Sequence, residues 1–178
     1  MPRKVVVLPY DPAWPALAAA ESARLRAALD DNVLAIHHFG STAVPGLCAK
    51  PILDLLPVVA DLEQVDGYNA RLSALGYTPR GEYGLPGRRY FPRLLPDAEE
   101  THTHHVHFYQ AGNPEIDRHL AVRDYLRAHP AEAEAYGRLK LDLAAQFPWD
   151  IDGYVAGKDA YVKDLEQRAA AWAAAGPP

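Results

Sequence analysis

The sequence predicts an α+β fold, in which helices pack on a mixed β-sheet and a further layer of helices lies at the C-terminus. Strand-like and helical segments are mixed in the first two thirds of the chain, whereas the last third has only helical patterns. The length of 178 residues, 49% of them hydrophobic, is enough for one well-buried domain and short for two. We therefore expect a single domain over residues 1–178, with a frayed tail from about residue 171 to 178.

The first part of the chain alternates between strand and helix candidates. Lys4 to Leu8 can form a short edge strand, and an alanine-rich helix follows from about Ala16 to Leu29. Val33 to Phe39 and Pro51 to Val59 are apolar and rich in β-branched residues, which predicts two strands with a Gly- and Pro-containing loop between them. Asp61 to Leu75 has helical periodicity, and Gly76 can close that helix in the left-handed conformation.

Three strand candidates follow, at Tyr77 to Glu82, Arg88 to Leu94 and Thr101 to Gln110, with a polar loop over Pro96 to Glu100. The last of these strands alternates between two sets of side chains. One face should carry His104, Val106 and Phe108, and the other His105, His107 and Tyr109.

The remaining residues predict helices. Asn113-Pro114 is a cap followed by a first-turn proline, and His129-Pro130 marks the start of a second helix that ends near Phe147. Asp152-Gly153 precedes a third helix, from Tyr154 to about Ala174.

Composition narrows the classes of function. A formal net charge of -5 argues against general nucleic-acid binding by electrostatic attraction. The single cysteine, Cys48, excludes an intramolecular disulfide framework and fits a reducing compartment. Because no apolar run is long enough for a membrane span and the N-terminal one is too short for a signal peptide, we expect a cytoplasmic protein without membrane contact.

The segment from His38 to Asp54 combines groups that handle phosphate and metal. Gly40 lets the backbone approach a ligand, and Ser41 and Thr42 offer hydroxyl and amide donors. Lys50 adds a mobile positive charge suited to phosphate, and Asp54 is a hard oxygen ligand for a cation such as Mg²⁺. Since both flanking strands meet this loop, these groups should line one cleft.

This segment resembles the signature of the GrpB (UPF0157) family. Further matches run through nearly the whole chain, at Trp14, Gly76-Tyr77, Arg89-Tyr-Phe91, His104-His-Val-His107, Arg123 to Arg127, Tyr136 to Lys140 and Tyr154 to Lys158. The resemblance implies the nucleotidyltransferase superfamily, with a fold like the palm of DNA polymerase β. In that superfamily a Gly-Ser turn precedes a strand with two carboxylates one residue apart, which hold the metal ions that bridge a triphosphate.

The chain departs from this pattern at Leu56, which occupies the position of the second carboxylate. His105 and His107, two apart on a strand, are candidates to complete a site for Mg²⁺, Mn²⁺ or Zn²⁺ with Asp54. Two alternatives stay open. In the first, the histidines are ordinary core or surface residues, or they serve as general acids or bases or contact phosphate. In the second, Asp54 is a buried aspartate that pairs with Lys50 or His38 for structure.

Several residues are candidates for binding a substrate: Gly40, Ser41, Thr42, Lys50, Arg89, Arg123 and Lys158. Arg89 beside Tyr90 and Phe91 could clamp phosphate, although a solvated basic face would have the same pattern. For Arg123 a structural ion pair is the alternative. If the protein is an enzyme, we expect Asp54, Lys50 and His38 to be catalytic.

Two functions fit the sequence. One is a nucleotidyltransferase-like protein that binds a nucleotide or other phosphorylated small molecule, with a divalent metal. The other is a catalytically inactive ligand-binding or interaction domain with a possible link to coenzyme A, because the module is joined to dephospho-CoA kinase in some related chains. Leu56 favours the inactive domain. The nucleotidyltransferase-like function is favoured by a cluster of polar residues: His38, Ser41, Lys50, Asp54, His105 and His107. The sequence leaves the oligomeric state open.

Overall fold

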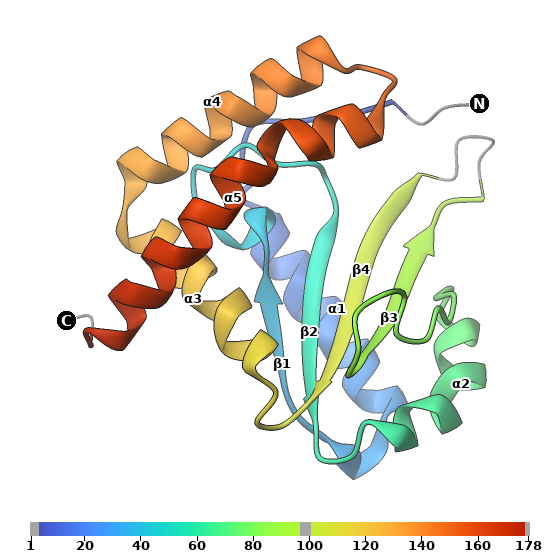
Figure 1. The fold of residues 1–178 in the computed structure, drawn as a ribbon. Helices are drawn as coiled ribbons and strands as arrows, with labels where there is room; N and C mark the ends of the chain where they lie inside the picture. The colour runs from blue at the N-terminus through green and yellow to red at the C-terminus, as the bar shows by residue number, and fades with distance from the viewer. Residues whose placement is uncertain (1–3, 97–100, 177–178) are drawn as a thin grey trace.

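The computed structural model describes residues 4–96 and 101–176, and within them a mixed four-stranded sheet forms the centre (Figure 1). The strands are β1 (Val33–Phe39), β2 (Leu53–Val59), β3 (Arg88–Leu94) and β4 (His102–Gln110), in the spatial order β1-β2-β4-β3. The pairs β1/β2 and β3/β4 are antiparallel, whereas β2/β4 is parallel. The predicted α+β class with a mixed sheet is confirmed.

One face of the sheet is covered by α1 (Trp14–Ala28), with α2 (Asn69–Ala74) beside it (Figure 1). Alternate strand residues point to this side, and the largest buried cluster forms there. It includes Leu25 of α1 and Leu29 just after it, Leu55 from β2, and Val106 and Phe108 from β4. The predicted apolar face of β4 is therefore correct.

The opposite face carries the C-terminal helices α3 (Pro114–Ala128), α4 (Pro130–Gln146) and α5 (Ile151–Ala174) (Figure 1). Asn113 caps α3, accepting a hydrogen bond from the Glu115 backbone N–H at 2.9 Å. Asp150 caps α5 through the Gly153 N–H at 2.9 Å, so this helix begins earlier than the sequence suggested. α5 ends at Ala174, where the sequence predicted, and so includes the first residues of the tail expected from about residue 171.

Two predicted strands are wrong. Lys4 to Leu8 makes only one bridge, between Leu8 and Ala49. Tyr77 to Glu82 likewise makes one bridge, from Tyr77 to Arg93. The Thr78 N–H donates to the Pro92 carbonyl at 2.9 Å, but Pro92 has no N–H with which to donate back. Tyr90 accepts from the Arg80 N–H but donates to the carbonyl of Gly81, one residue further on, so the ladder is interrupted at both points.

The predicted helix from Asp61 to Leu75 is divided into a 3₁₀ helix, Glu63–Tyr68, and the short α2. Gly76 closes it at φ 91°, as expected. Most of the loop predicted from Pro96 to Glu100 lies outside the described residues. Among the helices in the described part of the chain, none has the length and apolar character needed to cross a membrane.

Candidate functional site

The loop after β1 lies directly against Asp54 of β2. Gly40 has φ 69° and ψ -172°, a conformation open essentially to glycine alone. A Cβ at Gly40 would overlap Asp54 Oδ2. The backbone of the Gly-Ser turn therefore lies so close to the Asp54 carboxylate that only glycine fits at position 40.

A cavity of about 250 Å³ opens beside this contact, between the sheet and the helical layer. It is lined by Gly40, Ser41, Thr42, Ala49, Lys50, Ile52, Asp54, His105, Tyr136, Lys140, Tyr154 and Lys158. The structure thus brings together residues from the Gly-Ser loop, β2, β4, α4 and α5. Ser41, Lys50 and Asp54 share one cleft, the arrangement that the sequence predicted.

Asp54 and two histidines form a group of potential metal ligands. The parallel pairing of β2 with β4 sets Asp54 opposite His105, and the Asp54 Oδ1 lies 3.4 Å from His105 Nδ1 and 4.0 Å from His107 Nε2. One ligand atom from each residue lies within 4.8 Å of the others. A carboxylate with two imidazoles suits Mn²⁺ or Zn²⁺ in particular, so these residues fit a divalent ion.

Electrostatics favour an ionised Asp54 and a neutral His107. Burial acts to raise the pKa of Asp54, but the hydrogen bond from His105 and the charges of His105, His107 and Lys50 outweigh it and lower the pKa. Burial lowers the pKa of His107 to about 3, against the attraction of Asp54. An anionic carboxylate beside a neutral imidazole is the protonation state that binds a cation.

Leu56, the residue at the second carboxylate position, lies on the same face of β2 as Asp54 but is fully buried. It packs with Phe39, Tyr109 and Ile116, and the last of these comes from α3. The structure therefore has an apolar contact between sheet and helix at the position where the sequence resemblance led us to expect an acid.

Three lysines approach the cavity from separate elements. Lys140 of α4 donates a hydrogen bond from Nζ to Ser41 Oγ at 2.9 Å. The Nζ atoms of Lys50 and Lys158 lie 5.6 and 5.9 Å from the centre of the Tyr154 ring. Burial, with the charges of Lys158 and Lys50, lowers the pKa of Lys140 to about 7, and burial also lowers that of Lys158.

Lys140 and the tyrosines Tyr136 and Tyr154 were not among the predicted site residues. All three lie in the segments Tyr136 to Lys140 and Tyr154 to Lys158, which the family resemblance had marked. The buried lysine could have been suspected from the spacing of four between Tyr136 and Lys140, which places both on one side of a helix.

His38 lies on the other side of the sheet from Asp54. It pairs with Leu55, whose side chain belongs to the α1 side, and its Nε2 lies 2.8 Å from Thr42 Oγ1. Burial lowers the pKa of His38 to about 4. Thr42 in turn donates to the Ile52 carbonyl at 3.4 Å, so His38 supports the loop through Thr42 and does not line the cavity.

Arg89 and Arg123 also lie outside this cavity. Arg89 forms a two-point ion pair with Asp66, at 2.8 and 3.0 Å, because its strand position points away from His105 and His107. Its neighbour Arg88 faces His107 instead. Arg123 donates to the His38 carbonyl at 3.2 Å, pairs with Asp124, and lines an adjoining cavity of about 200 Å³ that shares Gly40 and Ser41 with the first.

The fold and the site define an α+β protein with a lysine-lined cavity beside a set of potential metal ligands. Sequence comparison then identifies the family: the model described as "GrpB protein" matches residues 4–168. The chain belongs to the GrpB family.

Individual relatives support this family assignment. The UPF0157 protein YqkA of Bacillus subtilis is 45% identical over 170 residues, which cover 96% of this chain and 48% of YqkA. A crystal structure of the conserved protein GrpB from Enterococcus faecalis aligns with a TM-score of 0.86 and 45% identity, covering 92% of this chain and 96% of that one. A dephospho-CoA kinase of Mycolicibacterium paratuberculosis is 31% identical over 95% of this chain and 47% of its own length. The chain thus spans about half the length of YqkA and of this kinase.

Proposed function

We propose that this protein binds a nucleotide or another phosphorylated small molecule together with a divalent metal ion. The observation that carries the proposal is the convergence of Lys50, Lys140 and Lys158 on a cavity that Asp54 and the Gly-Ser turn also line. Three ammonium groups around one partly buried space repel one another. An anion that enters this space would relieve their repulsion, and phosphate is the anion that lysine and a Gly-Ser turn suit best.

Each residue then has a definite task. Lys140 and Ser41 would donate hydrogen bonds to phosphate oxygens, while Lys50 and Lys158 would add positive charge from the loop before β2 and from α5. Asp54, His105 and His107 would hold the metal ion. When bound, a divalent ion supplies positive charge that neutralises phosphate oxygens. Gly40 keeps the loop close enough for both groups to meet one ligand.

Nucleotidyl transfer is the reaction that the superfamily resemblance implies. In that reaction Lys50 and Lys140 would orient the triphosphate, and Asp54 would fix the metal ion. His38 would contribute only through Thr42, since its ring does not line the cavity. Arg89 is left out of the proposed site because Asp66 holds it elsewhere.

The second candidate is a ligand-binding domain without turnover, and Leu56 favours it. An apolar residue at the second acidic position leaves Asp54 as the carboxylate on this face of β2. The relative named as a dephospho-CoA kinase makes dephospho-CoA or coenzyme A a ligand worth testing, since both carry phosphate on a nucleotide.

Thermal stabilisation and calorimetry with the whole chain test the proposal. The four nucleoside triphosphates, dephospho-CoA and coenzyme A are titrated with Mg²⁺, Mn²⁺ or Zn²⁺. A ligand at 100 times its dissociation constant should add about 2.7 kcal/mol to the free energy of unfolding. Asp54→Asn should abolish the metal-dependent part, whereas Asp142→Asn, an exposed acid on α4, should not. No stabilisation by any phosphorylated ligand would overturn the proposal.

Release of pyrophosphate separates the two candidates. Turnover that Asp54→Asn lowers by several powers of ten supports transfer, and ligand binding without turnover supports the receptor. Pyrophosphate release that survives Asp54→Asn would contradict both, because each uses Asp54 to anchor the metal ion.

A further inference from the structure

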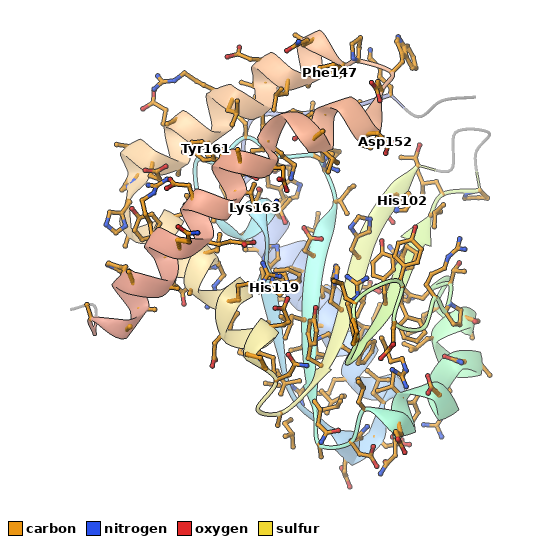
Figure 2. The ribbon with its side chains drawn as sticks, in the orientation of Figure 1. His102, His119, Phe147, Asp152, Tyr161 and Lys163 are labelled. Carbon is orange, nitrogen blue, oxygen red and sulfur yellow. The ribbon has the colours of Figure 1, made fainter. Side chains whose placement is uncertain are left out.

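His102 is one of the four histidines in the segment from His102 to His107, of which only His105 and His107 were predicted as ligands, and a bulge brings it onto the metal-binding side of β4. Arg93 of β3 pairs with His104, but the next residue, Leu94, pairs with His102, so Thr103 is an extra residue on β4. Without that extra residue, alternation would turn His102 to the same side as His104. Bulges redirect side chains in this way and are frequent beside functional sites. Figure 2 shows His102 where β4 begins, beside the described end of β3.

The redirected ring contacts His105. His102 Nδ1 lies 2.8 Å from His105 Nε2, and the two rings meet edge to face with centroids 5.1 Å apart. The other ring nitrogen of His105, Nδ1, is the one that lies 3.4 Å from Asp54 Oδ1. The imidazole of His105 is thus held at both nitrogens, by His102 on one side and by Asp54 on the other.

This geometry admits two proton arrangements for a neutral His105. In the first, His102 donates to His105 Nε2, and His105 Nδ1–H donates to Asp54. In the second, His105 Nε2–H donates to His102 Nδ1, and the lone pair of His105 Nδ1 faces Asp54. The second arrangement is unfavourable next to a bare carboxylate, and it is the one that a cation between Nδ1 and Asp54 requires.

We infer that His102 is a positioning residue for the metal site: it accepts the Nε2–H of His105 and so presents Nδ1 of that ring to the metal ion held by Asp54. This inference rests on the proposed function. A histidine ligand commonly donates its second N–H to such an acceptor, which fixes both the tautomer and the orientation of the ring.

His107 has the opposite arrangement. Arg88, which can only donate, lies with Nη1 3.4 Å from His107 Nδ1, so a neutral His107 accepts there and carries its proton on Nε2, the atom toward Asp54. The two histidines are therefore not equivalent. His105 is arranged to ligate, whereas His107 must give up its contact with Arg88 before its Nε2 can do so.

The test uses Zn²⁺ alone, without nucleotide. Calorimetry compares the wild type with His102→Ala and His102→Asn, and with His129→Ala, which removes a ring at the junction of α3 and α4. His102→Ala should weaken Zn²⁺ binding by about 10- to 100-fold. His102→Asn should restore most of it, because the side-chain oxygen of Asn can accept near the position of Nδ1. His129→Ala should leave the affinity unchanged.

Nitrogen NMR of the imidazole rings reads the tautomer directly. With Zn²⁺ bound, wild-type His105 should carry its proton on Nε2 and have Nδ1 bound to metal. Metal on Nε2, or Zn²⁺ affinity in His102→Ala equal to that of the wild type, would overturn the inference. If either result is found while the wild type binds Zn²⁺ and Asp54→Asn does not, the inference about His102 is wrong but the proposed metal site is still supported. If the wild type fails to bind any divalent ion, the metal site and the inference both fall.

Discussion

Lys140 has the most unusual environment of the residues around the cavity. The residue is only 3% exposed. Its Nζ donates a hydrogen bond to Ser41 Oγ and lies 4.5 Å from the centre of the Tyr136 ring. Burial and two neighbouring lysines lower its pKa to about 7. Near neutral pH this residue can therefore gain or lose its charge, whereas an ordinary lysine stays charged.

Phosphate binding should consequently depend on pH. A phosphate ligand binds the protonated form of Lys140, so its contribution is present below about pH 7 and is lost as pH rises through that value. Between pH 6.5 and 8.5 the affinity for tripolyphosphate should fall severalfold, up to about tenfold per pH unit. Calorimetry at a series of pH values measures this fall. In Lys140→Met the part of the pH dependence that comes from Lys140 should disappear, leaving the titration of the ligand and of Lys158, and an identical profile in the two proteins would contradict the assignment.

Single residues also show how far the sequence could predict the site. Ser41, Lys50 and Asp54 lie within fourteen positions of one another, and the loop between two strands was enough to place them together. Lys140 and Lys158 reach the same cavity from helices far along the chain, and their direction depends on how those helices pack. Arg89 was predicted to bind substrate, but it is Arg88 that faces His107. Alternation along a strand separates two sets of side chains but does not show which set faces the site.

At the scale of elements, the turn after β1 depends on Gly40. Gly40→Ala should cost about 1 to 3 kcal/mol of stability because its backbone conformation suits only glycine. The new Cβ should also displace the Asp54 carboxylate, so stabilisation by metal ions should be lost in the fraction that folds. Gly46→Ala is the matched control, since Gly46 also has a positive φ of 80° but has no atom within 4 Å of its position for a Cβ. Equal loss of metal response in both variants would show that strain alone, and not the contact with Asp54, is responsible.

β2 offers a second prediction at this scale, because Leu56 packs between the sheet and α3. Leu56→Asp would place two acids one residue apart on β2, the spacing that the sequence resemblance led us to expect, but it would bury a carboxylate among Phe39, Tyr109 and Ile116. We expect a loss of about 3 kcal/mol or more in urea denaturation, and no second metal ion. Leu56→Met should cost less than about 1.5 kcal/mol. A stable Leu56→Asp variant that binds two ions would refute this account of β2.

Elements whose patterns are local were predicted well, and those that depend on pairing were not. β1 and β3 begin and end where predicted, and α3 follows its Asn-Pro signal. Tyr77 to Glu82 does not form a strand, because Pro92 on the opposing strand lacks a donor and Tyr90 bonds to Arg80 and Gly81 out of register. The bulge at Thr103 is a property of two strands together, so the sequence of β4 alone could not place His102 beside His105.

At the scale of the molecule, the cavity lies where the helical layer meets the sheet. Its walls come from the Gly-Ser loop, β2 and β4 on one side and from α4 and α5 on the other. A phosphorylated ligand would therefore add to the side-chain clusters and hydrogen bonds, such as that from Lys140 to Ser41, through which these two parts of the fold already meet. A metal ion alone would bind only to side chains of β2 and β4, namely Asp54, His105 and His107.

Hydrogen exchange should separate these two effects. Zn²⁺ or Mn²⁺ alone should slow amide exchange mainly in β2 and β4, whereas metal with a nucleoside triphosphate should also protect the loop over residues 40–43 and the parts of α4 and α5 around Lys140 and Lys158. Lys163→Met, at an exposed position on α5, should retain this protection. Protection confined to the sheet in the presence of both ligands would mean that the lysines do not contact the nucleotide.

The central claim, that one ligand site joins the Asp54 metal ligands to the lysine-lined cavity, is tested most directly by a crystal structure with Mn²⁺ and tripolyphosphate. Anomalous scattering from manganese locates the ion without reference to any assumed chemistry. We predict a single strong peak in direct contact with the Asp54 carboxylate and His105 Nδ1, and tripolyphosphate density within hydrogen-bonding distance of Lys140 and Ser41. A manganese peak remote from Asp54, or phosphate bound elsewhere while this cavity holds only water, would contradict the claim.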